Sequence, residues 1–310
     1  MFCRIFIIFI IFLAFLKAQV IEPQLKINLE NNIIFMTYDS KNLLVGTDGG
    51  SVMEVGLNGS VKEIVKLDNI KNFYSDSYAP KIYGISKFDN DLLILSEGDF
   101  GSKNLNLFKD GLKIKLDIDT NGLKQVEFVG ENLAFLGFSS NQIALLDLES
   151  QKIIYKKQIS QAPFSSFSID LEYFALVCES GVVYFGTWSD GKILWSKEVH
   201  KDNAYSVKLK NEFIITAGQD RMVGILSDIK KKAKLDLIEA DFLVYSVGLG
   251  YEHFAFMANE NADIKLLELE SKSEIATLSG HKSIINAIVF IDKNKIASSE
   301  DGKNILIWEF

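Results

Sequence analysis

The sequence predicts an all-β fold, a seven-bladed β-propeller, and three observations predict it. Short apolar segments separated by polar turn residues recur along the chain at intervals of about 40 residues. The last unit stops one segment short of the others, and an unpaired segment near the N-terminus could complete it. Apolar residues make up 48% of the chain and aromatic residues 12%, which is enough to fill a large core. Because only 3 Pro occur and 21 Gly are scattered through turns, we expect one domain without linkers.

Each predicted blade contains at least three recognisable strands. The first strands are expected to begin near Ile33, Lys81, Lys124, Ser165, Ala204, Leu243 and Ile284. The second strands are expected over residues 43–46, 92–95, 133–136, 174–177, 213–216, 254–257 and 296–298. The third strands are expected over residues 52–55, 105–108, 143–146, 182–185, 223–226, 264–267 and 305–308. Seven such sets predict seven blades.

The ends of the chain indicate how the ring closes. The last unit ends at Phe310 after its third strand, whereas earlier units continue into a fourth, such as residues 193–195 and 274–278. Residues 24–29 alternate between apolar and polar side chains, as a half-buried strand does. Pairing this segment with the C-terminal strand would cover two free sheet edges at once. We therefore expect the N-terminal strand to complete the last blade.

Residues 280–310 resemble a WD40 repeat. They contain Gly280-His281, an apolar strand, a polar turn, a second strand with Ser298, a turn with Asp301 and a third strand that ends in Trp308. The resemblance implies a hydrogen-bonded structural tetrad of His281, Ser298, Asp301 and Trp308. Asp48 and Asp220 occupy the matching turn in the first and fifth blades, but only the last unit combines Gly-His with Trp. The other blades are expected to be held by packing alone.

Residues 1–18 are predicted to be a secretory signal peptide, and residues 19–310 the propeller. A basic residue, Arg4, precedes an apolar run from Ile5 to Leu16, and Ala18 offers a small residue for cleavage. The run is shorter than the roughly 20 residues that span a bilayer. The sequence therefore predicts export to the periplasm without stable membrane insertion after cleavage. Retention of the segment as an uncleaved anchor is the alternative.

No catalytic, cofactor or metal-binding motif is recognisable in the sequence. The three histidines, His200, His253 and His281, are far apart and lack neighbours at metal-ligand spacing. Cys178 is expected to be a small buried apolar residue. The formal net charge of −8 disfavours nucleic acid as a partner. We expect a non-enzymatic protein without a cofactor. An exported enzyme that gathers carboxylates around the central channel is the alternative.

A partner-binding surface is predicted where the connection between blades one and two meets a loop of blade two. Phe73, Tyr74 and Tyr78 belong to the first loop and Phe100 to the second, and the propeller pattern places both loops on one face. Exposed aromatic side chains are typical of protein interfaces. Local packing of these rings over the junction is the alternative. The basic run of residues 230–234 is interpreted as a solvated hairpin on the opposite face, with contact to an acidic partner as the alternative.

An exported WD40-type propeller of this size, rich in Ile, Lys and Asn, resembles the NapL family of bacterial periplasmic nitrate reductase accessory proteins. The resemblance covers the whole chain, and its specific motif is the final repeat. It implies a periplasmic factor that supports assembly of nitrate reductase or electron delivery to it, with nitrate reductase subunits as partners. The family offers no functional residues to transfer. A generic exported scaffold in a cell-envelope complex is the alternative.

Overall fold

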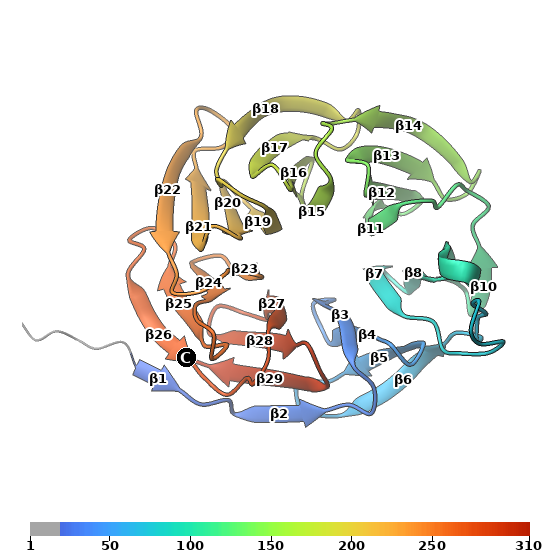
Figure 1. The fold of residues 1–310 in the computed structure, drawn as a ribbon, viewed down its shortest axis with the longest axis horizontal. Coiled ribbons are helices and arrows are strands. Elements are labelled where there is room, and N and C mark those ends of the chain that lie inside the picture. Colours follow the sequence, from blue (N-terminus) through green and yellow to red (C-terminus); the bar gives the residue numbers. More distant parts are fainter. Residues whose placement is uncertain (1–18) are drawn as a thin grey trace, which may run out of the picture.

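The computed structural model describes residues 19–310, and they form one closed ring of seven sheets (Figure 1). The fold is thus the seven-bladed β-propeller that the sequence predicts, consistent with a WD40-type protein. The predicted signal peptide, residues 1–18, lies outside the described residues. Within residues 19–310 no helix has both the length and the apolar character needed to cross a membrane.

Each blade begins with a strand next to the central axis and ends with a strand at the outer rim (Figure 1). Blade one is built from β3 (Ile33–Tyr38), β4 (Leu43–Thr47), β5 (Ser51–Val55) and β6 (Val61–Lys66). Blade two is built from β7 (Ile82–Phe88), β8 (Asp91–Glu97), β9 (Lys103–Lys109) and β10 (Leu112–Lys115). Blade three is built from β11 (Leu123–Gly130), β12 (Leu133–Phe138), β13 (Gln142–Asp147) and β14 (Lys152–Gln158). Blades four and five are built from β15 (Phe164–Asp170), β16 (Tyr173–Cys178), β17 (Val182–Thr187) and β18 (Lys192–Glu198); and β19 (Ala204–Lys210), β20 (Phe213–Gly218), β21 (Met222–Ser227) and β22 (Lys234–Glu239). Blade six contains β23 (Val247–Leu249), β24 (His253–Met257), β25 (Ile264–Glu268) and β26 (Glu274–Leu278), and blade seven contains β27 (Ile285–Phe290), β28 (Lys295–Glu300) and β29 (Asn304–Glu309).

The hydrophobic core is divided into clusters that lie between neighbouring blades. Leu44 and Val52 of blade one pack with Ile82, Ile85 and further residues of blade two, and equivalent clusters fill the other junctions. The second strands are the most deeply buried, since both of their faces meet a neighbouring blade; β4 is buried along its whole length. Each fully buried side chain of this size contributes about 1.5–3 kcal/mol. The blades are therefore held together mainly by apolar contact.

The ring closes as the sequence predicts, through β2 (Leu25–Asn28). This strand pairs with β29 in antiparallel register from Leu25 opposite Ile307 to Asn28 opposite Asn304. The pairing continues beyond the strand, because the backbone N–H of Leu29 donates to the C=O of Lys303 at 2.9 Å. Ile27 and Leu29 are buried in the junction between blades seven and one. The closing strand thus completes one sheet and one core cluster.

Two features differ from the sequence-based expectation. β1 (Gln19–Ile21) adds a fifth, parallel strand to blade six by pairing with β26, and three residues are too few to show a strand pattern. The first strand of blade six begins at Val247, not near Leu243. Val244 is nevertheless fully buried in the core, so the apolar signal before Val247 comes from a packed loop.

Polar side chains on the innermost strands tie one blade to the next. The inner edge of such a strand has no neighbour within its own sheet, so its backbone groups need other partners. Gln125 of β11 supplies one pair, since its amide accepts from the N–H of Phe167 at 2.9 Å and donates to the C=O of that residue at 2.8 Å. Three more ties follow the same principle: Ser86 to Phe128, Ser168 to Leu209, and Asn286 to Ile33.

We expect deletion of residues 19–30 to make the protein aggregate or melt far earlier. Each ladder hydrogen bond lost with β2 contributes about 1 kcal/mol, and several of them with Ile27 and Leu29 approach a total stability of about 5–15 kcal/mol. Deletion of residues 19–23 is the matched control, because it removes β1 and leaves β2 in place. Thermal unfolding followed by circular dichroism compares the two. Equal melting of the long deletion and the full ring would contradict closure by β2.

Candidate functional site

The predicted partner-binding loops of blades one and two are joined by backbone hydrogen bonds. The connection between the blades, residues 67–81, forms a narrow loop that is held by a bridge between Ile70 and Tyr78. The second loop contains the short 3-10 turn η1 (Asp99–Gly101). The N–H of Lys71 donates to Asp99 Oδ1 and the N–H of Phe100 donates to the C=O of Lys71, both at 2.8 Å. The two loops therefore form one connected surface.

Three of the four predicted aromatic residues are exposed on this surface. The side chains are 83% exposed at Phe73, 98% at Tyr74 and 56% at Phe100. The rings of Phe73 and Phe100 contact each other with centroids 5.2 Å apart, which leaves most of both rings open to solvent. We call Phe73, Tyr74 and Phe100 the aromatic patch. Local packing, the alternative reading, accounts for only a part of the surface of these rings.

Phe100 has a backbone conformation that is unusual for its residue type. Its φ of 54° and ψ of 35° lie in the left-handed region, which is uncommon for bulky side chains. Such conformations cost about 1–3 kcal/mol and are concentrated at functional sites. Glycine would adopt the same backbone without this cost. Eleven other non-glycine residues of the described chain have a positive φ, among them the exposed Leu171, but Phe100 is the only aromatic one.

Tyr78, the fourth predicted residue, lies differently. Its side chain is half-buried, and its hydroxyl donates to Glu97 Oε1 at 3.1 Å. Glu97 also accepts from the N–H of Lys81 at 3.3 Å, at the start of blade two. Tyr78 thus connects the loop to the blade beneath it. It supports the aromatic patch and is not part of its exposed surface.

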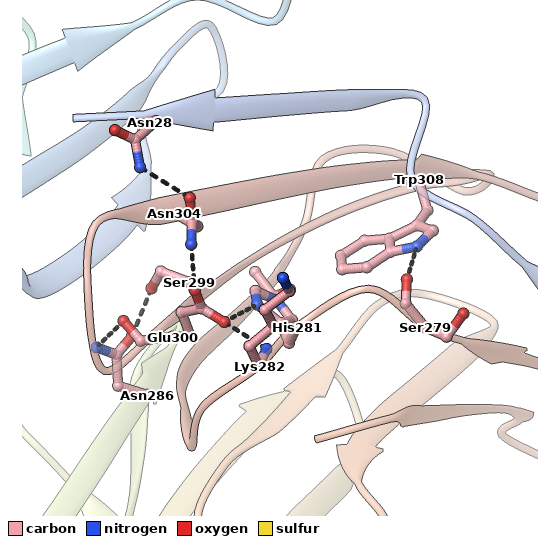
Figure 2. A network of polar contacts seen from close by, with 10 residues as sticks. Asn28, Ser279, His281, Lys282, Asn286, Ser299, Glu300, Asn304 and Trp308 are labelled. Carbon is pink, nitrogen blue, oxygen red and sulfur yellow. Dashed lines mark hydrogen bonds and ion pairs between the residues drawn. The ribbon is translucent and has the colours of Figure 1, made fainter. Parts of the chain in front are cut away.

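The last blade contains a buried hydrogen-bonded cluster around His281 (Figure 2). Its Nε2 lies 2.6 Å from Ser298 Oγ and its Nδ1 lies 3.0 Å from Glu300 Oε2. The expected carboxylate, Asp301, is exposed and is not the partner of His281. Ser298 and Glu300 are two residues apart on β28 and so point to the same side, whereas Asp301 follows in the turn. The longer glutamate side chain reaches from the strand to the position expected for the aspartate.

Trp308 lies beside this cluster but is not bonded to Ser298. Its ring centroid is 5.6 Å from that of His281, and its indole N–H donates to the backbone C=O of Ser279 at 3.3 Å. Figure 2 shows that contact apart from the hydrogen bonds around Glu300. Trp308 is fully buried. The indole N–H of Trp308 therefore fixes the loop before His281, while the rest of the ring fills the core.

The protonation of the cluster follows from its geometry and burial. Burial lowers the pKa of His281 below its usual value, although the neighbouring carboxylate of Glu300 opposes this. Burial alone would raise the pKa of Glu300, but hydrogen bonds from Asn304, Lys282 and His281 outweigh it and lower the pKa. A neutral imidazole beside an ionised carboxylate must donate from Nδ1 to Glu300. Nε2 then accepts from the Ser298 hydroxyl, so every member is satisfied and the cluster is structural.

Blade five contains a second cluster of the same kind, which the sequence analysis missed. His200 Nε2 lies 2.7 Å from Thr216 Oγ1, and His200 Nδ1 lies 2.9 Å from Asp220 Oδ1. Here the turn aspartate is the partner because Gly218 occupies the strand position that corresponds to Glu300. A Cβ on Gly218 would lie 2.1 Å from His200 Nδ1. Packing alone therefore does not hold this blade, contrary to expectation.

A sequence signal for the second cluster was present. His200 precedes Thr216 by 16 residues, and His281 precedes Ser298 by 17. Asp220 lies in the turn that matches Asp301, but blade five has no tryptophan that would reveal the similarity. Leu226 occupies the position of Trp308, opposite the second residue of the preceding strand in both blades. The histidine and the carboxylate can thus be kept without the indole.

Neither histidine cluster is arranged for catalysis or metal binding. Among residues 19–310 no three His, Cys, Asp or Glu side chains are grouped so that they could hold a metal ion. His200 and His281 are almost completely buried, so substrate has no access to them. Cys178 is also fully buried, as its position in a second strand predicts. No model of a known protein family matches the chain, and no curated protein matches it significantly.

We expect Glu300→Ala to lower the free energy of unfolding by about 1–3 kcal/mol, because it leaves the buried His281 Nδ1–H and the Lys282 N–H without an acceptor. Asp301→Ala is the matched control. Its side chain is exposed, so the change is expected to stay within about 0.5 kcal/mol. Urea denaturation measures both variants. A larger loss for Asp301→Ala would show that Asp301, and not Glu300, completes the tetrad.

Proposed function

We propose that the chain is a non-enzymatic protein-interaction module and that its partner docks on the aromatic patch of Phe73, Tyr74 and Phe100. The observation that carries this proposal is the strained, left-handed backbone that holds Phe100 exposed beside Phe73. Aromatic side chains dominate the binding free energy of many protein interfaces. Leu171 also has a positive φ and an exposed side chain, but that side chain is aliphatic, whereas Phe100 lies beside Phe73 in a cluster of exposed rings.

The shape of the surface supports the same proposal. The patch belongs to two loops fixed to each other and, through Tyr78 and Glu97, to blade two. Loops held in this way lose little conformational freedom when a partner binds. Propeller loops are suited to this role, since the sheets beneath them are rigid. The patch would then act as a preformed anchor for one partner.

The finer proposal concerns compartment and partner. The apolar run before Ala18 supports export to the periplasm, and the resemblance to the NapL family supports an accessory role for a periplasmic nitrate reductase. Under this proposal a nitrate reductase subunit, or a factor that assembles it, contacts the aromatic patch. A cell-envelope complex unrelated to nitrate reduction would use the same surface with another partner.

The combined substitution Tyr74→Ser with Phe100→Gly is expected to weaken binding of purified nitrate reductase by at least about 2 kcal/mol, or roughly thirtyfold. The melting temperature should stay within a few degrees, because glycine relieves the left-handed strain at residue 100. Bio-layer interferometry measures the affinity, and thermal unfolding of the same preparations measures the melting temperature.

Lys231→Glu with Lys232→Glu is the control, since that hairpin lies between β21 and β22, on the opposite face. Unchanged binding with a lowered melting temperature in the aromatic variant would show that the rings only pack locally. Absence of binding by the unaltered protein would reject the nitrate reductase proposal and leave the patch to another partner.

Export predicts a mature chain that begins near Gln19. Cleavage after Ala18 would remove the apolar run and leave β1 as the first element of the exported protein. Mass spectrometry of the native protein from a periplasmic fraction measures the N-terminus. A chain that keeps Met1 in the membrane fraction would establish the anchored alternative.

A further inference from the structure

The centre of the ring contains a polar cavity of about 610 Å³. Residues of β3, β7, β11, β15, β19 and β27 line it, so it lies on the axis around which Figure 1 shows the blades. A second cavity of about 230 Å³ adjoins it, because Phe35, Met36, Gln125, Phe167 and Lys208 line both. Ligand sites in proteins commonly have volumes of about 300–1,000 Å³. The larger cavity is therefore big enough for a small metabolite.

Two charged side chains on the inner strands that line this cavity have no partner in residues 19–310. Glu127 of β11 and Lys208 of β19 come from blades three and five, and both are half-buried. Within residues 19–310 neither forms a hydrogen bond or an ion pair, although each influences the pKa of the other. Most polar groups near them on the inner strands join neighbouring blades, as Gln125 and Ser168 do. Glu127 and Lys208 are thus the charged residues of these strands that line the cavity and lack a partner within residues 19–310.

The surroundings of Glu127 and Lys208 disfavour the charged forms of both side chains as long as the two are not paired. Burial raises the pKa of the Glu127 carboxyl to about 7, and Lys208 lowers it only in part. Burial likewise lowers the pKa of Lys208. The other charged groups that line the cavity do not compensate: Asp39 and Lys87 pair with each other, and Lys41 and Asp89 belong to the turns after β3 and β7. The Glu127 carboxylate, an acceptor, and the Lys208 ammonium group, a donor, therefore line the cavity without full solvation.

The adjoining cavity shows a third unsatisfied group. Ser246 lines it and is 3% exposed, and its hydroxyl has no hydrogen-bond partner within the described part of the chain. Buried hydroxyl groups are nearly always hydrogen-bonded in native proteins, so each exception requires an explanation. Lys208 borders the same cavity. The unsatisfied hydroxyl therefore lies at the wall of the cavity that Lys208 borders.

We propose that the central channel binds a small zwitterionic solute, with its carboxylate at Lys208 and its ammonium group at Glu127. Such a solute supplies the missing opposite charge to each side chain without bringing the two side chains together. The two charges of the solute match those of Lys208 and Glu127, whereas a simple anion or cation can match only one of them.

Isothermal titration of the full chain with four compounds tests this proposal: 2-aminobutyrate, 4-aminobutyrate, butyrate and n-butylamine. All have a four-carbon chain, and only the first two are zwitterions at pH 7. At least one aminobutyrate should bind about tenfold or more tightly than butyrate and n-butylamine, corresponding to about 1.4 kcal/mol. The two charges lie close together in 2-aminobutyrate and far apart in 4-aminobutyrate, so the pair covers a short and a long separation of Glu127 from Lys208.

Variants assign the two charges. Glu127→Gln should abolish the preference for the aminobutyrate over butyrate, and Lys208→Met the preference over n-butylamine. Lys210→Gln is the control, because Lys210 lies two residues further along β19 with its Nζ 3.8 Å from the centre of the Tyr251 ring. Equal affinity for butyrate and both aminobutyrates, or no binding of either zwitterion, would overturn the proposal and assign the channel to water or to a simple anion. Retained discrimination in Glu127→Gln and Lys208→Met would overturn it as well.

Discussion

The pairing of β2 with β29 is the contact on which the rest of the ring depends. Asn28 and Asn304 are hydrogen-bonded at 2.9 Å although 276 residues separate them in sequence. Contacts of such separation form at a high entropic cost, so local blade structure has to compensate for them. Once formed, the pairing places Ile27 and Leu29 in the core between the last and the first blade. Within residues 19–310 every other blade junction joins blades that are neighbours in sequence, whereas β1 adds only a short parallel contact to blade six.

The last blade contains a polar link between this closure and its interior. Asn28 of β2 bonds to Asn304, Asn304 donates to Glu300, and Glu300 accepts from His281, as Figure 2 shows. A glutamate suits this arrangement, since one carboxylate oxygen accepts from Asn304 and the other from His281 and from the N–H of Lys282. In blade five the aspartate bonds only locally, to His200, Lys201 and Met222. The exception to the tetrad pattern thus occurs in the blade that closes the ring.

Much of the fold could be predicted from the sequence because blades are made by local pattern. Alternating short strands and polar turns located the second and third strands, and the missing fourth strand identified the closure. The sequence could not distinguish Glu300 from Asp301, because that choice depends on side-chain reach after folding. It did not indicate the three-residue β1, whose pairing depends on a neighbour far along the chain. For the candidate site, it placed Phe73, Tyr74 and Phe100 on one face, but only the structure separates them from the half-buried Tyr78.

The residues that stabilise the ring differ from those that could bind a partner or a ligand. Apolar clusters between the blades supply most of the stability, and the buried histidine clusters are fully hydrogen-bonded, so both leave little freedom for other roles. Two places combine unsatisfied or strained groups with an accessible surface or cavity: the left-handed Phe100 with its exposed neighbours on one face, and Glu127, Lys208 and Ser246 along the axis. A closed ring tolerates both, because neither belongs to a junction cluster between blades. The face and the axis are therefore the parts of this protein in which binding can evolve without loss of the fold.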